Sequence, residues 1–151
     1  MMDLFKIAEA KFAFSLNASG KANRWNKPGE FVIYASQSRA LATLEMVARR
    51  SMIMPGKLDY KMMVIQVEDS ASVQEISMAQ LPASWNALSK YPTLQELGSG
   101  WYQSQNTLLL KVPSAIIPEE FNFVINTLHP EFESRLKLIQ TSDYFWDQRL
   151  L

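Results

Sequence analysis

Short apolar segments rich in β-branched and aromatic residues recur along this chain, and they constrain its fold more than any other feature. We predict strands at residues 4–7, 31–34, 61–67, 107–112, 121–126 and 135–139. Only one segment, from about Ser38 to Arg50, has a strong helical pattern. A shorter helix is predicted from Thr93 to Gln103, with an interruption at 98–100. Because helices do not alternate regularly with strands, this order predicts an α+β fold with mixed or antiparallel β-sheets and few helices.

Size and charge narrow the classes of protein further. The chain has 151 residues without an internal repeat or linker, which predicts a single domain over residues 1–151. Its 15 basic and 15 acidic side chains cancel, so direct binding to nucleic acid is not expected. The chain has no cysteine and one histidine, so we predict neither a disulfide nor a metal site. No apolar run approaches the roughly 18 residues of a membrane span, and the first residues do not resemble a signal peptide. We therefore expect a cytoplasmic protein without membrane contact.

A polar loop over residues 15–30 carries Arg24 next to Trp25. The planar guanidinium of an arginine suits a diphosphate, to which it donates paired charge-assisted hydrogen bonds. The alternative interpretation is a solvated loop arginine without a ligand. Trp25 is predicted to anchor the loop on the core.

Glu45 lies at the edge of the predicted apolar stripe of the first helix, about 40° around the helix axis from Leu41. The stripe is expected to consist of Leu41, Leu44 and Ala48. Two interpretations of Glu45 stay open at this point. It either forms an ion pair with Arg49 one helical turn later, or it faces a cleft and stabilises the positive charge that develops on a sugar during glycosidic-bond cleavage.

Two other polar side chains have both structural and functional interpretations. Tyr34 ends a predicted strand, where a tyrosine either belongs to the core or stacks on a heterocycle. Ser114 follows Pro113 and is predicted to start a turn or to cap a helix near Ile117. A serine hydrolase is not expected, because no G-x-S-x-G sequence surrounds Ser114 and the single histidine, His129, lies in a predicted loop.

The same residues belong to a larger set of spaced motifs. In chain order these are Arg24-Trp25-Asn26, Pro28-Gly29, Tyr34-Ala35-Ser36, Leu44-Glu45, Leu81-Pro82, Val112-Pro113-Ser114-Ala115, Asn122, Ile125-Asn126, His129-Pro130 and Phe145-Trp146-Asp147-Gln148-Arg149-Leu150. Together they resemble the RES domain family, toxins of bacterial toxin–antitoxin pairs that are named for an arginine, a glutamate and a serine. The resemblance covers nearly the whole chain. Lys6 stands where the family usually has an arginine in its first strand.

The resemblance implies a fold similar to that of ADP-ribosyltransferases, with NAD⁺ bound in a cleft between two sheets. It implies cleavage of the nicotinamide–ribose bond, by hydrolysis or phosphorolysis, which depletes cellular NAD⁺. The residues that it implies as catalytic are Arg24, Glu45 and Ser114, and those that it implies as NAD⁺-binding are Lys6, Arg24, Tyr34 and Asn126. In the mechanism that we expect, Arg24 and Lys6 hold the diphosphate and Tyr34 stacks near the nicotinamide. Ser114 orients the nicotinamide or its ribose, and Glu45 stabilises the oxocarbenium ion.

The resemblance also implies partners. NAD⁺ is expected as a substrate and no cofactor is expected. A cognate helix-turn-helix antitoxin of the Xre-like type would block the cleft and would bind the DNA operator in place of this chain. The chain is expected to form a homo-oligomer or a toxin–antitoxin hetero-oligomer. The basic side chains expected around the cleft entrance are Lys6, Lys21, Arg24 and Lys27. Two alternative functions stay open, namely ADP-ribosylation of a protein and a catalytically inactive nucleotide-binding module.

Overall fold

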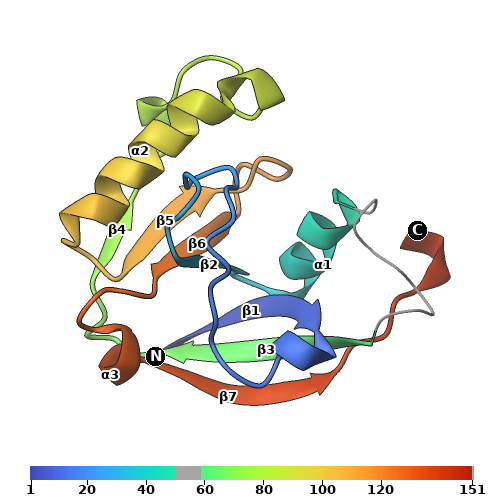
Figure 1. Cartoon of the computed structure of the whole chain (residues 1–151). Helices are drawn as coiled ribbons and strands as arrows, with labels where there is room; N and C mark the ends of the chain where they lie inside the picture. Colours follow the sequence, from blue (N-terminus) through green and yellow to red (C-terminus); the bar gives the residue numbers. More distant parts are fainter. Residues whose placement is uncertain (50–58, 151) are drawn as a thin grey trace.

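The structure is a computed structural model that describes residues 1–49 and 59–150, and a twisted sheet forms its centre (Figure 1). The strands are β1 (Met2–Glu9), β2 (Val32–Ser36), β3 (Tyr60–Val67), β4 (Val73–Glu75), β5 (Leu109–Pro113), β6 (Phe121–Asn126) and β7 (Leu136–Asp143). The α-helices are α1 (Arg39–Val47), α2 (Tyr91–Ser104) and α3 (Phe132–Arg135). Short 3-10 helices span Ala10–Phe12, Met78–Gln80, Leu88–Lys90 and Gln148–Leu150. The predicted α+β fold class is confirmed, and each predicted strand is present.

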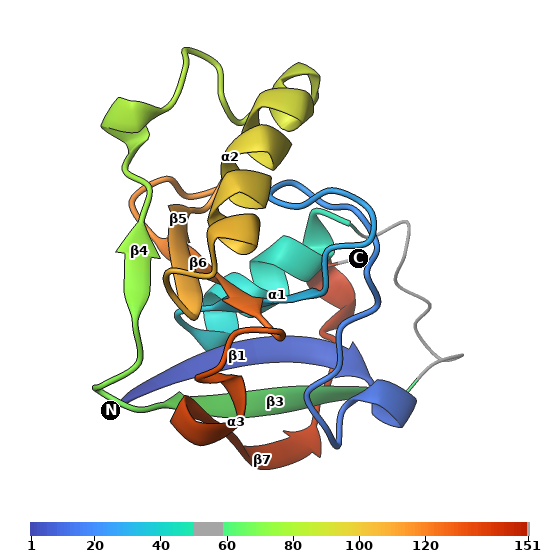
Figure 2. The same ribbon diagram turned by 60° about the vertical axis from the view of Figure 1, so that its left-hand side comes forward.

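The strands form one seven-stranded mixed sheet in the order β4-β5-β6-β2-β1-β3-β7. Strands β4 and β5 are parallel, and the other neighbouring pairs are antiparallel. Strands β1 and β2 pair at a single position, Phe5 opposite Ser36, whereas β1 pairs with β3 along its whole length. The sheet therefore has two halves, β4-β5-β6-β2 and β1-β3-β7, whose strands run in different directions (Figure 1 and Figure 2). The two separate sheets implied by the resemblance are thus two halves of one sheet, because the β1–β2 pair joins them.

Helix α1 packs against β1 and β2, at the junction of the two halves. It begins as predicted, because the Ser38 hydroxyl accepts a hydrogen bond from the Leu41 amide at 3.0 Å and caps the first turn. The helix ends before Arg49, and Arg50 and the predicted turn at 55–56 lie outside the described residues.

The apolar stripe predicted for α1 is partly wrong. Leu41 and Ala42 are buried, Leu44 is half-buried and Ala48 is exposed. The helix is short and ends at Val47, so Ala48 lies past the surface that the sheet covers.

Helix α2 continues without a break through Gly98-Ser99-Gly100, where the sequence predicted an interruption. A Cβ at Gly98 would lie 1.7 Å from the carbonyl oxygen of Trp25. Glycine is therefore needed for the close contact between this helix and the loop before β2, and that contact offsets the roughly 1 kcal/mol helix penalty of glycine. The Trp25 side chain is 2% exposed, which confirms its predicted anchoring role.

Strand β4 and helix α3 were not predicted, because they are too short to show a periodic pattern. None of the helices in the described ranges is long and apolar enough to cross a membrane.

Two large apolar clusters lie on opposite faces of β2. One joins residues of both sheet halves, namely Leu4, Ile33, Ala35, Ile65, Val67, Leu108, Leu109, Phe123, Ile125 and Leu136. The other joins α2 and the loop to the sheet, through Trp25, Val32, Ile76, Trp85, Leu94, Trp101, Leu110, Val112 and Val124. Because neighbouring residues of β2 belong to different clusters, this strand and its preceding loop are held from both sides.

Candidate active site

A cavity of about 530 Å³ lies at the junction of the two sheet halves, within the usual size of a small-molecule site. Its walls come from β1, β2, α1 and the loop before β2. The predicted site residues that line it are Lys6, Arg24, Tyr34 and Glu45. The structure thus brings together four residues from four different segments of the chain, and the other two predicted residues are placed elsewhere.

Glu45 extends from α1 to the cavity wall and is half-buried. Its Oε2 atom accepts a hydrogen bond from the Ser114 hydroxyl at 3.0 Å and a very short one from the Asn122 amide. Within the described ranges, Oε1 has no hydrogen bond and Glu45 has no ion pair with Arg49. Of the two interpretations left open for Glu45, the ion pair with Arg49 is therefore wrong. One carboxylate oxygen is fixed, and the other has no donor among the described residues.

Ser114 is fully buried and does not line the cavity. Its hydroxyl donates to Glu45 and accepts hydrogen bonds from the amides of Ile116 and Ile117, at 3.1 and 3.2 Å. The predicted turn at Ser114 is confirmed, but no helix follows it. The structure does not place Ser114 where it was expected to contact the nicotinamide or its ribose, because its hydroxyl is buried and donates to the Glu45 carboxylate.

Asn122 lines the cavity and was missed as a site residue. Its amide nitrogen donates to Glu45, and its Oδ1 atom accepts a hydrogen bond from the Ser36 hydroxyl at 2.7 Å. Ser36 and Asn122 are opposite each other in the pair of β2 and β6, so the sheet register fixes this contact. Both residues were present in the motifs, but only the pairing of two distant strands shows that they support Glu45.

Tyr34 lines the cavity with its hydroxyl group already engaged. The phenol donates to Asn26 Oδ1 at 2.6 Å and accepts from the Trp25 amide at 3.0 Å. Burial raises the pKa of the phenol well above its ordinary value, so the group stays neutral. Tyr34 can therefore offer an aromatic surface to a ligand, while its hydroxyl group holds the Arg24 loop.

Arg24 lines the cavity, and its guanidinium contacts the start of α2. It stacks over the Tyr91 ring with 4.7 Å between the guanidinium carbon and the ring centroid, and Nη1 donates to the Asn86 carbonyl at 3.2 Å. These contacts use part of its donor set and leave other N–H groups for a ligand. Arg24 is therefore held by neighbouring groups, and its binding to a diphosphate stays a prediction.

Positive charge gathers on the cavity wall. The basic side chains that line it are Lys6, Lys21, Arg24 and Arg49. Burial, together with the positive charge of Arg49, lowers the pKa of the Lys6 ammonium to about 8. In the described parts of the chain this ammonium has no ion pair or hydrogen bond. The wall is therefore suited to a ligand with negative charge.

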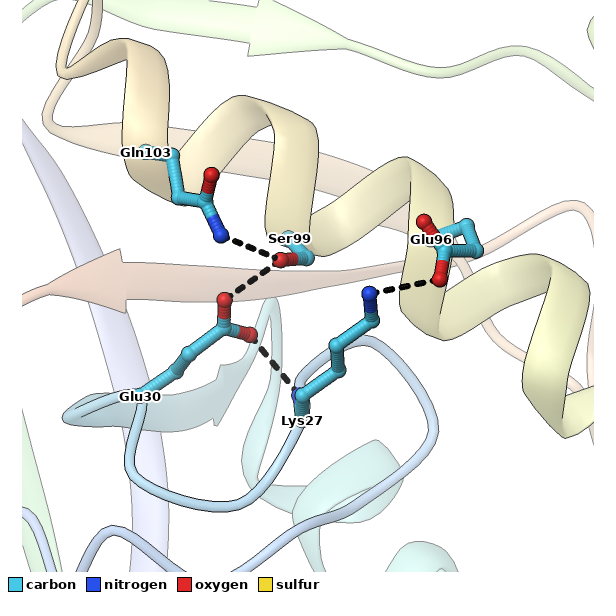
Figure 3. Close-up of polar contacts among 5 residues, drawn as sticks. All are labelled: Lys27, Glu30, Glu96, Ser99 and Gln103. Carbon is cyan, nitrogen blue, oxygen red and sulfur yellow. Dashed lines mark hydrogen bonds and ion pairs between the residues drawn. The ribbon is translucent and has the colours of Figure 1, made fainter.

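Lys27, predicted at the entrance, does not line the cavity. Its ammonium forms an ion pair with Glu96 of α2 at 2.5 Å, between the loop and the helix (Figure 3). That position follows from the loop turning at Pro28-Gly29 before it enters β2.

Asn126, predicted to bind NAD⁺, is fully buried at the end of β6 and does not line the cavity. Its side chain donates to the Tyr102 carbonyl at 3.2 Å and accepts from the Leu128 amide at 3.0 Å, so it holds a turn.

His129 is buried close to Asn126 and accepts a hydrogen bond from the Glu131 amide at Nδ1, as expected for a structural histidine. Within the described ranges, no group of three side chains could hold a metal ion.

Comparison with protein families supports the motifs read from the sequence. A model of the RES domain matches residues 4–147. The chain belongs to the RES domain family. Among similar RES proteins, the "Prs ADP-ribosylating toxin" of Sphingobium sp. is 38% identical over 85% of this chain and 80% of its own length. A "Toxin Res" of Yersinia enterocolitica is 28% identical over 99% of both chains.

A solved structure has a fold similar to that of this chain. The crystal structure of the MbcT–MbcA toxin–antitoxin complex of M. tuberculosis contains a chain that superposes with a TM-score of 0.75 at 19% identity. The match covers 95% of this chain and 84% of that chain. At this identity the likeness supports the arrangement of strands and helices described above.

Proposed function

We propose that this protein is the toxin of a bacterial toxin–antitoxin system and that it cleaves the nicotinamide–ribose bond of NAD⁺. The observation that carries the proposal is the arrangement of hydrogen-bond donors around the Glu45 carboxylate. Two donors fix its Oε2 atom, and its Oε1 atom has no donor among the described residues, in a cavity with basic walls. A carboxylate fixed in this way is pre-organised to stabilise a positive charge on a bound substrate.

In the proposed reaction, the diphosphate lies against Arg24 and Lys6, and the ring of Tyr34 lies near the nicotinamide. The carbon–nitrogen bond between ribose and nicotinamide breaks, and its electron pair goes to the nicotinamide nitrogen. The ribose ring becomes an oxocarbenium ion, which the carboxylate of Glu45 stabilises. Water or phosphate then forms the new carbon–oxygen bond, and the proton of a water nucleophile goes to solvent. Nicotinamide leaves as a neutral molecule, so no strong general acid is needed and no cofactor is used.

The test follows nicotinamide release by chromatography from purified protein and NAD⁺, with and without phosphate. Release without phosphate indicates hydrolysis, and release that depends on phosphate indicates phosphorolysis. The variant Glu45→Ala is the control, because its side chain is not part of the apolar contact of α1. Absence of nicotinamide release under both conditions would contradict the proposal.

ADP-ribosylation of a protein is the second candidate, favoured by the 38% identical relative whose name describes an ADP-ribosylating toxin. In that reaction a side chain of the target protein takes the place of water at the ribose. NAD⁺ labelled in its adenine part distinguishes the two, because the label then appears on a macromolecule. If calorimetry shows that NAD⁺ binds and stays intact, and no label is transferred, the chain is an inactive nucleotide-binding module.

We further propose a helix-turn-helix antitoxin as partner, consistent with the toxin–antitoxin complex in which the similar fold was solved. The toxin would then be active when it is expressed alone. Expression in bacteria with and without the adjacent gene tests this, with cellular NAD⁺ as the readout. Normal growth and unchanged NAD⁺ at high expression of this chain alone would contradict the toxin function.

A further inference from the structure

A second carboxylate cluster lies outside the cavity, between the loop before β2 and helix α2 (Figure 3). Glu30 is 7% exposed, and both its oxygens are engaged. Oε1 accepts from the Lys27 amide at 2.7 Å, and Oε2 accepts from the Ser99 hydroxyl at 2.5 Å. The Ser99 oxygen in turn accepts from the Gln103 amide at 3.1 Å. A buried carboxylate requires such partners, and here they join a loop to a helix.

Further contacts join the same helix to the residues on either side of Arg24. The Gln95 amide donates to the Asn23 carbonyl at 2.9 Å. The backbone of Gly98 lies directly against the Trp25 carbonyl. The backbone on both sides of Arg24 is therefore fixed to one face of α2.

The side chain of Arg24 depends on the same helix. Its guanidinium lies over Tyr91, the first residue of α2, and within hydrogen-bond distance of the Asn86 carbonyl. A shift of the loop relative to α2 would move the backbone of Arg24 away from the groups that hold its guanidinium. The ion pair of Lys27 and Glu96 is a weaker contact, because the two side chains are 39% and 70% exposed.

We propose, on the basis of the proposed function, that Glu30 and Ser99 are positioning residues for Arg24. Neither residue lines the cavity. Their hydrogen bond fixes the loop on α2, and it thereby holds the guanidinium of Arg24 where a diphosphate binds. Loss of the bond lowers affinity for ligands that carry a diphosphate and leaves the Glu45 carboxylate in place.

The experiment uses the variant Ser99→Ala, which removes one hydroxyl and retains the helix because alanine has the higher helix propensity. ADP is the probe, because it carries the diphosphate and is not a substrate for nicotinamide release. Calorimetry is expected to show about five- to tenfold weaker binding of ADP, in line with the loss of one charge-assisted hydrogen bond. The KM for NAD⁺ is expected to rise by a similar factor, and kcat is expected to change less than twofold.

A double-mutant cycle separates positioning from general structural damage. In the Arg24→Ala background, Ser99→Ala should cause no further loss of ADP binding. Losses that multiply, or unchanged ADP binding in Ser99→Ala alone, would overturn the inference and leave the proposed function intact. If the unaltered protein does not bind ADP, the diphosphate site itself is wrong, and both proposals fail.

Two matched variants complete the test. Ser99→Thr retains the hydroxyl and should bind ADP like the unaltered protein. Glu96→Gln removes only the exposed ion pair and should bind ADP within twofold of the unaltered protein. An equal loss in Glu96→Gln would overturn the assignment to Glu30 and Ser99. If Ser99→Ala does not fold, Glu30→Gln replaces it, because it keeps the side-chain shape and removes the charge. It should weaken ADP binding in the same direction, and no change would overturn the inference.

Discussion

Glu45 and Glu30 each lie in a small cluster with a serine and an amide side chain. The Glu45 carboxylate accepts hydrogen bonds from Ser114 and Asn122. The Glu30 carboxylate accepts one from Ser99, which in turn accepts one from Gln103. Around Glu45, both donors converge on Oε2, and Oε1 has no donor in the described parts of the chain. Around Glu30, the two oxygens have one donor each, from a backbone amide and a serine. Glu45 lines the cavity, and Glu30 is buried between the loop and α2.

Under the proposed function, Glu45 is the reactive carboxylate and Glu30 is a structural one, and the two differ in the arrangement of their donors and in their burial. Each carboxylate has two donors, so both keep acceptor sites, but those of Glu30 are buried between the loop and α2, whereas Glu45 lines the cavity. A carboxylate held by one oxygen is equally fixed, but its other oxygen can interact with a charge that forms during a reaction. We therefore expect substitutions in the two clusters to affect different measurements.

The largest effect is expected for Glu45→Gln. This variant keeps the shape and an acceptor for Ser114 and Asn122, but it removes the negative charge. We expect kcat for nicotinamide release to fall by about 10²- to 10³-fold, as for loss of one pre-organised electrostatic group. Thermal unfolding should be unchanged. If Glu30→Gln lowers kcat as strongly, the contrast between the two carboxylates is wrong.

Gly98→Ala tests the contact between α2 and the loop before β2, next to the Glu30 cluster. The added methyl group cannot fit beside the Trp25 carbonyl, so the loop and α2 must separate. We expect a loss of about 1–3 kcal/mol in the free energy of unfolding, measured by chemical denaturation, together with weaker binding of ADP. Gly100 is the control, because a Cβ there meets open space. Gly100→Ala should stabilise α2 by up to about 1 kcal/mol, and a similar loss in both variants would contradict the packing argument.

The amides of the two clusters provide a smaller and more direct contrast. Asn122→Ala removes one of the two donors to Glu45, and we expect kcat to fall about tenfold, which corresponds to roughly 1.4 kcal/mol in the barrier. Gln103→Ala removes the donor to Ser99 and should leave kcat unchanged. Steady-state kinetics of nicotinamide release measures kcat of both variants. An equal fall in kcat would contradict the difference proposed between the Glu45 and Glu30 clusters.

The smallest effect concerns the basic wall next to Glu45. Because the pKa of Lys6 is lowered to about 8, its ammonium loses the proton as pH rises through that value, and attraction to an anionic substrate decreases. We expect kcat/KM for NAD⁺ to fall by roughly three- to tenfold between pH 7 and pH 9, since this ratio reports ionisations of the free enzyme. Lys6→Arg keeps its charge in this range and should give a flatter profile. The raised pKa of Tyr34 keeps that phenol neutral throughout, so a fall that persists in Lys6→Arg would contradict the role of Lys6.

The sequence predicted which residues belong to the site, but it predicted only some of their contacts. Arg24, Tyr34, Glu45 and Lys6 were expected at the cavity, and they lie there. Ser114 was expected to touch the ligand, and Asn126 was expected to bind it, but both are buried and hold protein groups. A motif identifies a polar residue, whereas its burial and the direction of its hydrogen bonds depend on segments that are distant in the chain.

The sequence by itself determined the positions of most strands, the start of α1 at Ser38 and the α+β class, because these follow from local periodicity and capping. Only the tertiary structure decided that α2 continues through Gly98, because a close backbone contact with Trp25 outweighs the local preference. It also decided the partners of Glu45. The register of β2 and β6 brings Asn122 to Ser36, and the chain that leaves β5 brings Ser114 behind α1. Such contacts join residues about 70 to 90 positions apart, and no local pattern encodes them.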